Sequence, residues 1–269
     1  MDAKTLPPED FRRMQLLQVD LLVEFDRVCR KNNISYCIGW GTLLGAVRHK
    51  GYIPWDDDAD IGMFREDYEL FKKVAMKDLN PSICWFQDHT TDPEYRRAFA
   101  KLRRTGTTYV RAGQEHLKGK TGVCIDVFPL DCMPNNPVAV SLHGAACFLM
   151  RKILWSEVGK YSAKGLERVA YIILSKIPIK FAFWIYEKLA QQSDKNSSKR
   201  VRVIGLSQNL GYNMPKKWFL NRREYEFEGK KLFGIKDYDE FLTYQYGDYM
   251  TPPPENERKQ HAPVSSYSF

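Results

Sequence analysis

The chain has 269 residues, a length that suits one large domain or two smaller ones. Hydrophobic residues make up 43% and charged residues 28% of the sequence, close to the values of soluble globular proteins, which argues against the disordered, collagen-like and membrane-embedded classes. The net charge of +8 favours an anionic partner such as phosphate, nucleic acid or an acidic membrane surface.

The N-terminus and the cysteines indicate a cytoplasmic protein. The first residues, MDAKTLPPEDFRRM, contain three acidic side chains and no apolar core, so an ordinary secretory signal is not expected. The six cysteines form no C-x-x-C pair, and a chain of this length needs no disulfides to hold its core. A reducing compartment is therefore expected.

Hydrophobic periodicity predicts alternating helices and strands. From Phe11, apolar residues recur at steps of three and four, which predicts an amphipathic helix that ends near Arg30. Residues 34–40 predict a short strand, followed by a glycine turn at Gly41 and Thr42 and a helical turn. This alternation predicts an α/β protein of the mixed α+β kind, in which helices flank a mixed sheet. The next predicted elements are a strand over 58–64, a helix over 66–79, and strands over 95–111 and 122–130.

Residues 138–200 predict a helical insertion within a single domain that covers residues 1–269. Two apolar stretches, 138–154 and 169–189, are expected to be helical, and two lysines and a proline interrupt the centre of the second. A buried insertion is the favoured interpretation. A helix in a membrane interface is the main alternative, and a true membrane span is disfavoured because central charges are costly. The proline-rich stretch after Tyr244 predicts no regular structure.

The strongest local signal is the acidic segment WDDDADIGM, residues 55–63. Alternate residues of an extended strand share a face, so Asp58 and Asp60 project together while their apolar neighbours face a core. Two carboxylates on one face favour a bound cation, and oxygen ligands indicate Mg²⁺ or Mn²⁺. The alternatives are a solvated acidic loop, an EF-hand whose glycine is replaced by Ile61, and the D-x-D metal site of a glycosyltransferase.

A third carboxylate, Asp126, lies in the apolar segment GVCIDVFPLD. This segment predicts a buried strand, where a lone carboxylate is costly unless it has a cation or a partner. A structural salt bridge to an arginine is one interpretation. The functional interpretation is that Asp58, Asp60 and Asp126 hold metal ions against a phosphoryl group.

The segment GTLLGAVRHKGYIPWDDDADIGM, residues 41–63, resembles the signature of the LicD family. The segments YRRAFAKLRRTGTTYVR, GVCIDVFPLD and YGDYMTPPPE support this resemblance over most of the chain outside the helical region. The best-known members of the family resemble phosphocholine transferases, and distant relatives include the fukutin-related ribitol-phosphate transferases. The resemblance implies a nucleotidyltransferase-like fold, in which a Gly-Ser turn cradles phosphate and three aspartates bind metal.

By this resemblance, Gly41 and Thr42 match the Gly-Ser turn, and Asp58, Asp60 and Asp126 match the metal-binding and catalytic aspartates. Thr42 replaces the commoner serine but keeps a hydroxyl. The fifteen residues between Thr42 and Asp58 exceed the general nucleotidyltransferase spacing.

Basic residues near these motifs are candidates for phosphate binding. Arg48 and His49 follow the glycine turn, and arginine suits bidentate phosphate contacts, although a solvated basic loop is the alternative. Lys101 and Arg103 share a face of an alternating strand and are expected to bind the nucleotide pyrophosphate.

Three aromatic residues are candidates for holding a quaternary ammonium, which binds to aromatic faces: one ends the first predicted strand and two immediately precede the acidic run. They are Trp40, Tyr52 and Trp55. Packing in the core is their alternative role.

Together, these features predict a cytoplasmic, metal-dependent phosphotransferase. It is expected to move phosphocholine or a related phospho-alcohol from CDP-choline, or another CDP-alcohol, to a hydroxyl of a glycan or glycolipid precursor. The enzymatic alternative is a D-x-D glycosyltransferase, and the non-enzymatic alternative is a basic protein that binds nucleic acid or membrane. No nucleic-acid partner is expected. The lysine-rich apolar stretch 165–190 predicts reversible association with the inner face of the cell membrane.

Overall fold

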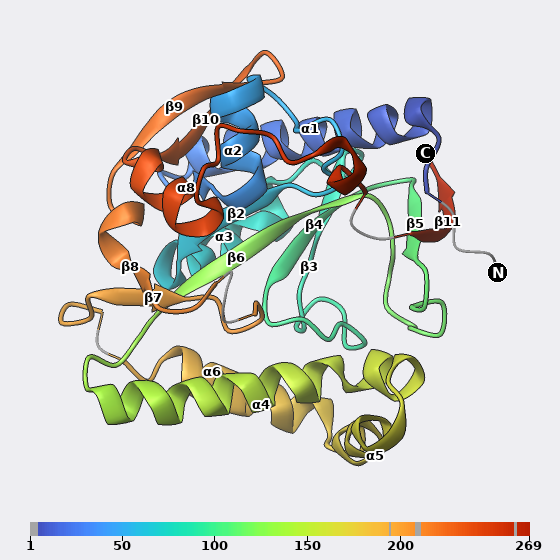
Figure 1. Ribbon diagram of the computed structural model, residues 1–269, viewed down its shortest axis with the longest axis vertical. Helices are drawn as coiled ribbons and strands as arrows, with labels where there is room; N and C mark the ends of the chain where they lie inside the picture. The colour runs from blue at the N-terminus through green and yellow to red at the C-terminus, as the bar shows by residue number, and fades with distance from the viewer. Residues whose placement is uncertain (1–4, 194, 208–210, 261–262) are drawn as a thin grey trace.

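The computed structural model describes residues 5–193, 195–207, 211–260 and 263–269 (Figure 1). The elements of the first half are, in chain order, α1 (Pro8–Lys31), β1 (Cys37–Ile38), α2 (Trp40–His49), β2 (Asp60–Phe64), α3 (Arg65–Asp78), β3 (Cys84–Gln87), β4 (Ala100–Arg104), β5 (Thr108–Arg111) and β6 (Cys124–Cys132). Those of the second half are α4 (Pro137–Ser162), α5 (Gly165–Leu174), α6 (Ile179–Ala190), β7 (Arg200–Arg202), β8 (Met214–Pro215), η1 (Lys216–Phe219), β9 (Arg222–Phe227), β10 (Lys230–Ile235), α8 (Tyr238–Tyr246), η2 (Glu255–Glu257) and β11 (Val264–Ser268).

The main sheet mixes parallel and antiparallel neighbours, which confirms the predicted mixed α/β class. Its strands follow the order β3-β4-β6-β2-β1-β10-β9, and β7 and β8 extend it from β6. Strands β2 and β6 run in parallel, with β4 antiparallel on the other side of β6. A separate two-stranded sheet joins β5 to β11 near the C-terminus (Figure 1).

Helices α1 and α3 pack against the sheet and against each other. The apolar face of α1 is buried, and Phe25 contacts Phe71 of α3 with ring centroids 4.5 Å apart. Ile61 and Met63 of β2 are buried in the same core. Because side chains alternate along a strand, Asp60 and Gly62 leave the sheet on the opposite face. Burial of the apolar face therefore fixes the face from which Asp60 projects.

The prediction for the chain around the first glycine turn is wrong in detail. Strand β1 has only two residues, because the chain enters α2 at Trp40. Gly41 and Thr42 therefore lie in the first turn of this helix, not in a glycine turn that precedes it. The acidic segment also differs, since β2 begins at Asp60 and Asp58 precedes the strand.

The single strand predicted over 95–111 is two strands, β4 and β5. They are separated by a turn in which Gly106 adopts a φ of 76°, a conformation that favours glycine. The sequence analysis also missed β3 and the strands β7 to β10. Several of these strands are short, and their pairing depends on partners that are distant along the chain.

Residues 138–200 contain α4, α5 and α6, which lie together below the sheet in Figure 1. Within the described residues, α4 is long and apolar enough to span a membrane, with 33% of its most apolar window buried. The continuous helix predicted over 169–189 is wrong, because α5 and α6 are bent by 92° at a break. Helix α5 buries only Tyr171, so the buried interpretation also fails for this helix.

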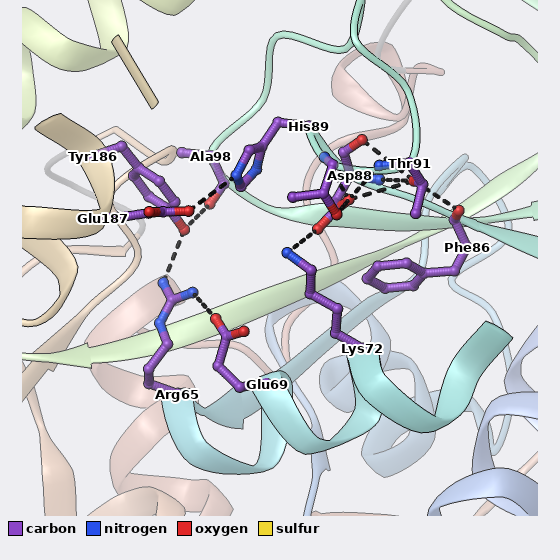
Figure 2. Close-up of polar contacts among 11 residues, drawn as sticks. Arg65, Glu69, Lys72, Phe86, Asp88, His89, Thr91, Ala98, Tyr186 and Glu187 are labelled. Atoms are coloured by element: carbon purple, nitrogen blue, oxygen red, sulfur yellow. Dashed lines mark hydrogen bonds and ion pairs between the residues drawn. The ribbon is translucent and has the colours of Figure 1, made fainter. Parts of the chain in front are cut away.

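A chain of polar contacts attaches α6 to the body of the protein (Figure 2). Arg65, at the start of α3, forms a bidentate ion pair with Asp131 of β6 at 2.7 and 2.9 Å. Its guanidinium also donates to the Tyr186 hydroxyl of α6 at 2.8 Å. The Tyr186 hydroxyl in turn donates to the Ala98 carbonyl oxygen at 2.9 Å. Arg65 thus connects α3, β6 and α6.

We expect Asp131→Ala to lower the free energy of unfolding by about 3–5 kcal/mol, because it leaves the Arg65 guanidinium without its buried counter-ion. The Asp131 side chain is 0% exposed. Glu69→Ala is a matched control, since Glu69 pairs with the same guanidinium at 3.1 Å but is 46% exposed. Its loss should stay below about 1 kcal/mol. Urea unfolding measures the change in unfolding free energy of both variants. Equal losses in Asp131→Ala and Glu69→Ala would contradict the special contribution of the buried ion pair.

Candidate active site

The pairing of β2 with β6 brings the predicted aspartates together. Asp60 lies directly opposite Asp126 in the parallel register, so both side chains leave the same face of the sheet. Asp58 precedes Asp60 by two residues, and all three aspartates line one pocket.

Repulsion between carboxylates dominates the electrostatics of this pocket. Burial raises the pKa of Asp60 well above its usual value. The negative charges of Asp58 and Asp126 raise this pKa further, whereas the positive charge of Lys101 lowers it. Lys101 lies opposite Asp126 in the register of β4 with β6, and its ammonium forms an ion pair with the Asp126 carboxylate. Asp126 thus has a cationic partner, which is a lysine and not an arginine.

Two aspartates that the sequence analysis did not assign join this cluster. Carboxylate oxygens of Asp56, Asp57 and Asp58 lie within 4.8 Å of one another. Asp56 and Asp57 are 5% and 4% exposed. Such a concentration of carboxylate oxygens fits a hard divalent cation. The sequence signal was the run of three aspartates before β2, from which only Asp58 was assigned to the site.

The start of α2 lies against the acidic cluster. A Cβ atom on Gly41 would lie 2.6 Å from Oδ2 of Asp56, so glycine allows the carboxylate to approach the helix. The dipole of α2 favours a negative charge at this end. The Thr42 hydroxyl accepts a hydrogen bond of 2.8 Å from the Asp60 backbone N–H. Gly41 thus faces a carboxylate, and Thr42 fixes the start of β2.

Two pockets meet at the carboxylates, because both are lined by Asp58 and Asp126. The larger, of about 550 Å³, is here called the aromatic pocket, and the smaller, of about 130 Å³, the basic pocket. The aromatic residues of the first are Trp40, Trp55, Phe128, Tyr246 and Tyr249. The basic residues of the second are Arg96, Arg97, Lys101, Arg103, Arg111 and Lys120.

The three predicted aromatic residues divide between pocket and core. Trp55 lines the aromatic pocket, with the Arg258 guanidinium 5.1 Å from its ring centroid. Trp40 lines the same pocket but is only 3% exposed. Tyr52 is 6% exposed and packs on Phe227 with ring centroids 5.0 Å apart. Tyr52 therefore has the core-packing role that was its alternative.

The predicted basic residues also differ in their surroundings. Arg48 lines the aromatic pocket and donates to the Tyr249 carbonyl oxygen at 2.6 Å. His49 is exposed, and its ring lies edge-on to Trp55 with centroids 6.5 Å apart. Partial burial and the charge of Arg48 lower the pKa of His49. Arg103 lines the basic pocket, where it is already bonded to other protein groups.

Four pocket residues were missed as site candidates, although each lies in or beside a segment that carried the family resemblance. Tyr246 and Tyr249 belong to YGDYMTPPPE, and Arg97 and Arg111 belong to YRRAFAKLRRTGTTYVR. Their proximity to the aspartates depends on the packing of segments that are distant along the chain.

Comparison with known proteins identifies the family of this chain. Residues 33–135 match the model of the family described as LicD/FKTN/FKRP, nucleotidyltransferase domain. The chain is 33% identical to the "Lipopolysaccharide cholinephosphotransferase LicD" of Haemophilus influenzae, over 95% of this chain and 97% of that protein. The "Ribitol 5-phosphate transferase FKRP" of Mus musculus and that of Homo sapiens are each 50% identical over 34 residues, 13% of this chain and 7% of theirs. The chain therefore belongs to the LicD family of transferases.

Proposed function

We propose that this protein transfers phosphocholine, or a related phospho-alcohol, from a CDP-activated donor to a hydroxyl of a glycan or glycolipid. The observation that carries this proposal is the cluster of Asp58, Asp60 and Asp126 at the junction of the two pockets. Similarity over nearly the full length to a protein named a lipopolysaccharide cholinephosphotransferase supports the choice of phosphocholine.

The carboxylate cluster suits Mg²⁺ or Mn²⁺. Burial raises the pKa of Asp60 and the neighbouring carboxylates raise it further, and a divalent cation would relieve the repulsion among them. Asp58, Asp60 and Asp126 would hold the ion. When bound, the metal supplies neutralising charge for the phosphoryl oxygens of the donor.

In the proposed reaction, the acceptor hydroxyl oxygen attacks the phosphorus of the phosphocholine group. The bond between this phosphorus and the bridging oxygen breaks, and CMP leaves with that oxygen. Asp126 accepts the proton of the acceptor hydroxyl. Lys101, which pairs with Asp126, is positioned to stabilise negative charge on the departing group.

The aromatic pocket suits the choline end of the donor. A quaternary ammonium cannot donate a hydrogen bond and binds to aromatic faces with negative charge nearby. Trp55, Tyr246 and Tyr249 provide such faces, and Asp248 adds a carboxylate to the same wall. Burial raises the pKa of Tyr246, and the neighbouring Asp60 and Asp56 raise it further, so this phenol stays neutral.

The donor is tested by CMP release with Mg²⁺ and a lipopolysaccharide acceptor. We expect CDP-choline to support turnover, EDTA to abolish it and added Mg²⁺ to restore it. Asp58→Asn and Asp60→Asn should each lower turnover by about 100-fold or more, because each removes negative charge from the site that holds the cation. Turnover of a nucleotide sugar in place of CDP-choline would support the D-x-D glycosyltransferase alternative and refute the proposal.

The raised pKa of Asp60 predicts how the metal-free protein responds to pH. The folded state binds a proton that the unfolded state releases near pH 4, so stability is lost as pH rises through the folded-state pKa. Asp60→Asn removes this titration. We expect the variant to be at least as stable as the wild type at about pH 8 in EDTA, as measured by urea unfolding. Asp20→Asn, at a 57% exposed side chain, is the control, and a clear loss of stability in Asp60→Asn would refute the prediction.

Substitutions of Trp55 and Tyr52 are expected to have different effects on the choice of donor. Trp55→Ala should lower kcat/KM for CDP-choline relative to CDP-glycerol by about 2- to 30-fold, because a cation–π contact is lost. Tyr52→Phe should leave this ratio unchanged, since the Tyr52 ring packs in the core. An unchanged ratio in Trp55→Ala, or a wild type that prefers CDP-glycerol, would favour a polyol-phosphate donor.

We also propose a membrane-facing location, which the exposed surface of α4, α5 and α6 supports. Residues 137–190 contain eight lysines and arginines against three acidic residues. Leu166 is 89% and Ile173 is 65% exposed on α5, and Phe181 and Trp184 of α6 are more than half exposed. Apolar side chains among lysines suit reversible binding to an anionic bilayer, where a glycolipid acceptor resides.

Binding to anionic vesicles tests this location. We expect the protein to sediment with vesicles that contain anionic lipid at low salt, and high salt to weaken the binding. Leu166→Glu with Ile173→Glu should reduce sedimentation strongly. Met76→Glu is the control, because Met76 is 73% exposed on α3, outside this surface. Equal binding of the wild type and the Leu166→Glu, Ile173→Glu double variant would contradict the proposed membrane contact. So would the absence of binding by the wild type at low salt.

A further inference from the structure

The basic pocket contains two arginines whose side chains make no close polar contact with the described part of the chain. The guanidinium groups of Arg97 and Arg111 line the pocket and make no hydrogen bond or ion pair there. Arg97 lies over the ring of Trp155 from α4, 4.4 Å from its centroid. Both arginines are thus available to an anionic ligand.

Other arginines of the same pocket already have protein partners. Arg96 lies 3.8 Å from the Glu157 carboxylate. Arg103 donates to the Gln87 side-chain oxygen and to the Gly122 carbonyl oxygen, the latter at 2.7 Å. The contrast indicates that Arg97 and Arg111 have a different role from their neighbours.

A buried hydroxyl accompanies the two arginines. Tyr95 lines the basic pocket and is 6% exposed, and its hydroxyl is buried without a hydrogen-bond partner among the described residues. A buried polar atom without a partner is costly, and a ligand oxygen that accepts its hydrogen bond would remove that cost.

The two arginines differ in their electrostatics, because the carboxylates of Asp57, Asp126 and Asp58 raise the pKa of Arg111 despite its burial, whereas the charge of Arg97 is unfavourable until an anion binds. Burial lowers the pKa of Arg97, and the charges of Arg111 and Arg103 lower it further. Preformed donors that repel one another are typical of binding sites, where the ligand supplies the missing charge.

We propose that the basic pocket binds the phosphate of the nucleotide half of the donor, with Arg97, Arg111 and the Tyr95 hydroxyl as hydrogen-bond donors. The inference rests on the proposed function, because a CDP-alcohol has a cytidine monophosphate half and a phospho-alcohol half. The arginines repel a quaternary ammonium, which suits the aromatic pocket instead. The donor pyrophosphate therefore lies across Asp58 and Asp126, the residues that the two pockets share.

Calorimetric titration with CMP in the presence of Mg²⁺ tests this assignment. Arg97→Gln and Arg111→Gln should each weaken CMP binding by about 10-fold or more, because each removes a charged hydrogen-bond donor. Arg104→Gln is the matched control on β4, since Arg104 lies outside both pockets and donates to the Ile83 carbonyl oxygen at 2.7 Å. The melting temperature of Arg97→Gln should not fall, because like-charge repulsion is removed, and thermal melting also checks that Arg111→Gln remains folded.

The outcomes separate this inference from the proposed function. Unchanged CMP affinity in both pocket variants would overturn it, even if the enzyme transfers phosphocholine. The expected loss of CMP affinity would support it even if a different alcohol is transferred. Glucose 6-phosphate is the second ligand. If it binds as tightly as CMP and loses the same factor in the variants, the pocket recognises a phosphate of the acceptor, and the assignment to the donor fails.

Discussion

The repulsion between Asp60 and Asp126 is the constraint on which the rest of the site depends. The register of β2 with β6 puts these carboxylates opposite each other on one sheet face, and the apolar side chains of β2 prevent a shift, because a slip of one residue would bury Asp60 in the core. The sheet thus holds two negative charges together at a cost in stability. Positive charge must come from elsewhere, and Lys101 supplies part of it.

Around this constraint, the protein separates charge into two pockets. Aromatic rings predominate on one side of Asp58 and Asp126, where Arg48 is the basic residue, and arginines predominate on the other, which Asp57, Glu94 and Glu157 also line. A ligand with a cation at one end and phosphates beyond it would match this polarity. An electrically neutral alcohol would gain less from the aromatic side, so the same geometry gives a physical basis for donor selection.

The sequence predicted those parts of the molecule that depend on local patterns. The periodicity of α1 and α3 and the strand that carries Asp126 followed from hydrophobic spacing. Helix α2 begins at Trp40, one residue before the predicted glycine turn. The sequence could not predict this start, because tertiary packing decides where a Gly-rich segment becomes helical. Tyr52 and Trp55 are both aromatic and only three residues apart in the sequence. Their tertiary contacts distinguish them, since Tyr52 packs on Phe227 in the core and Trp55 lies under Arg258 at the pocket. The place of Arg97 and Arg111 in the basic pocket could not be predicted, because it depends on how β5 and α4 pack beside the strands that carry the aspartates.

The walls of the two pockets and the carboxylates between them come from different stretches of chain. The matched domain, residues 33–135, contains the aspartates, but Trp155 lies on α4, and Tyr246 and Tyr249 lie near the C-terminus. A fragment limited to that domain would lack one wall of each pocket. Sequence change in α4 or the C-terminal segment can therefore alter which ligand fits while leaving the chemistry of the strands intact.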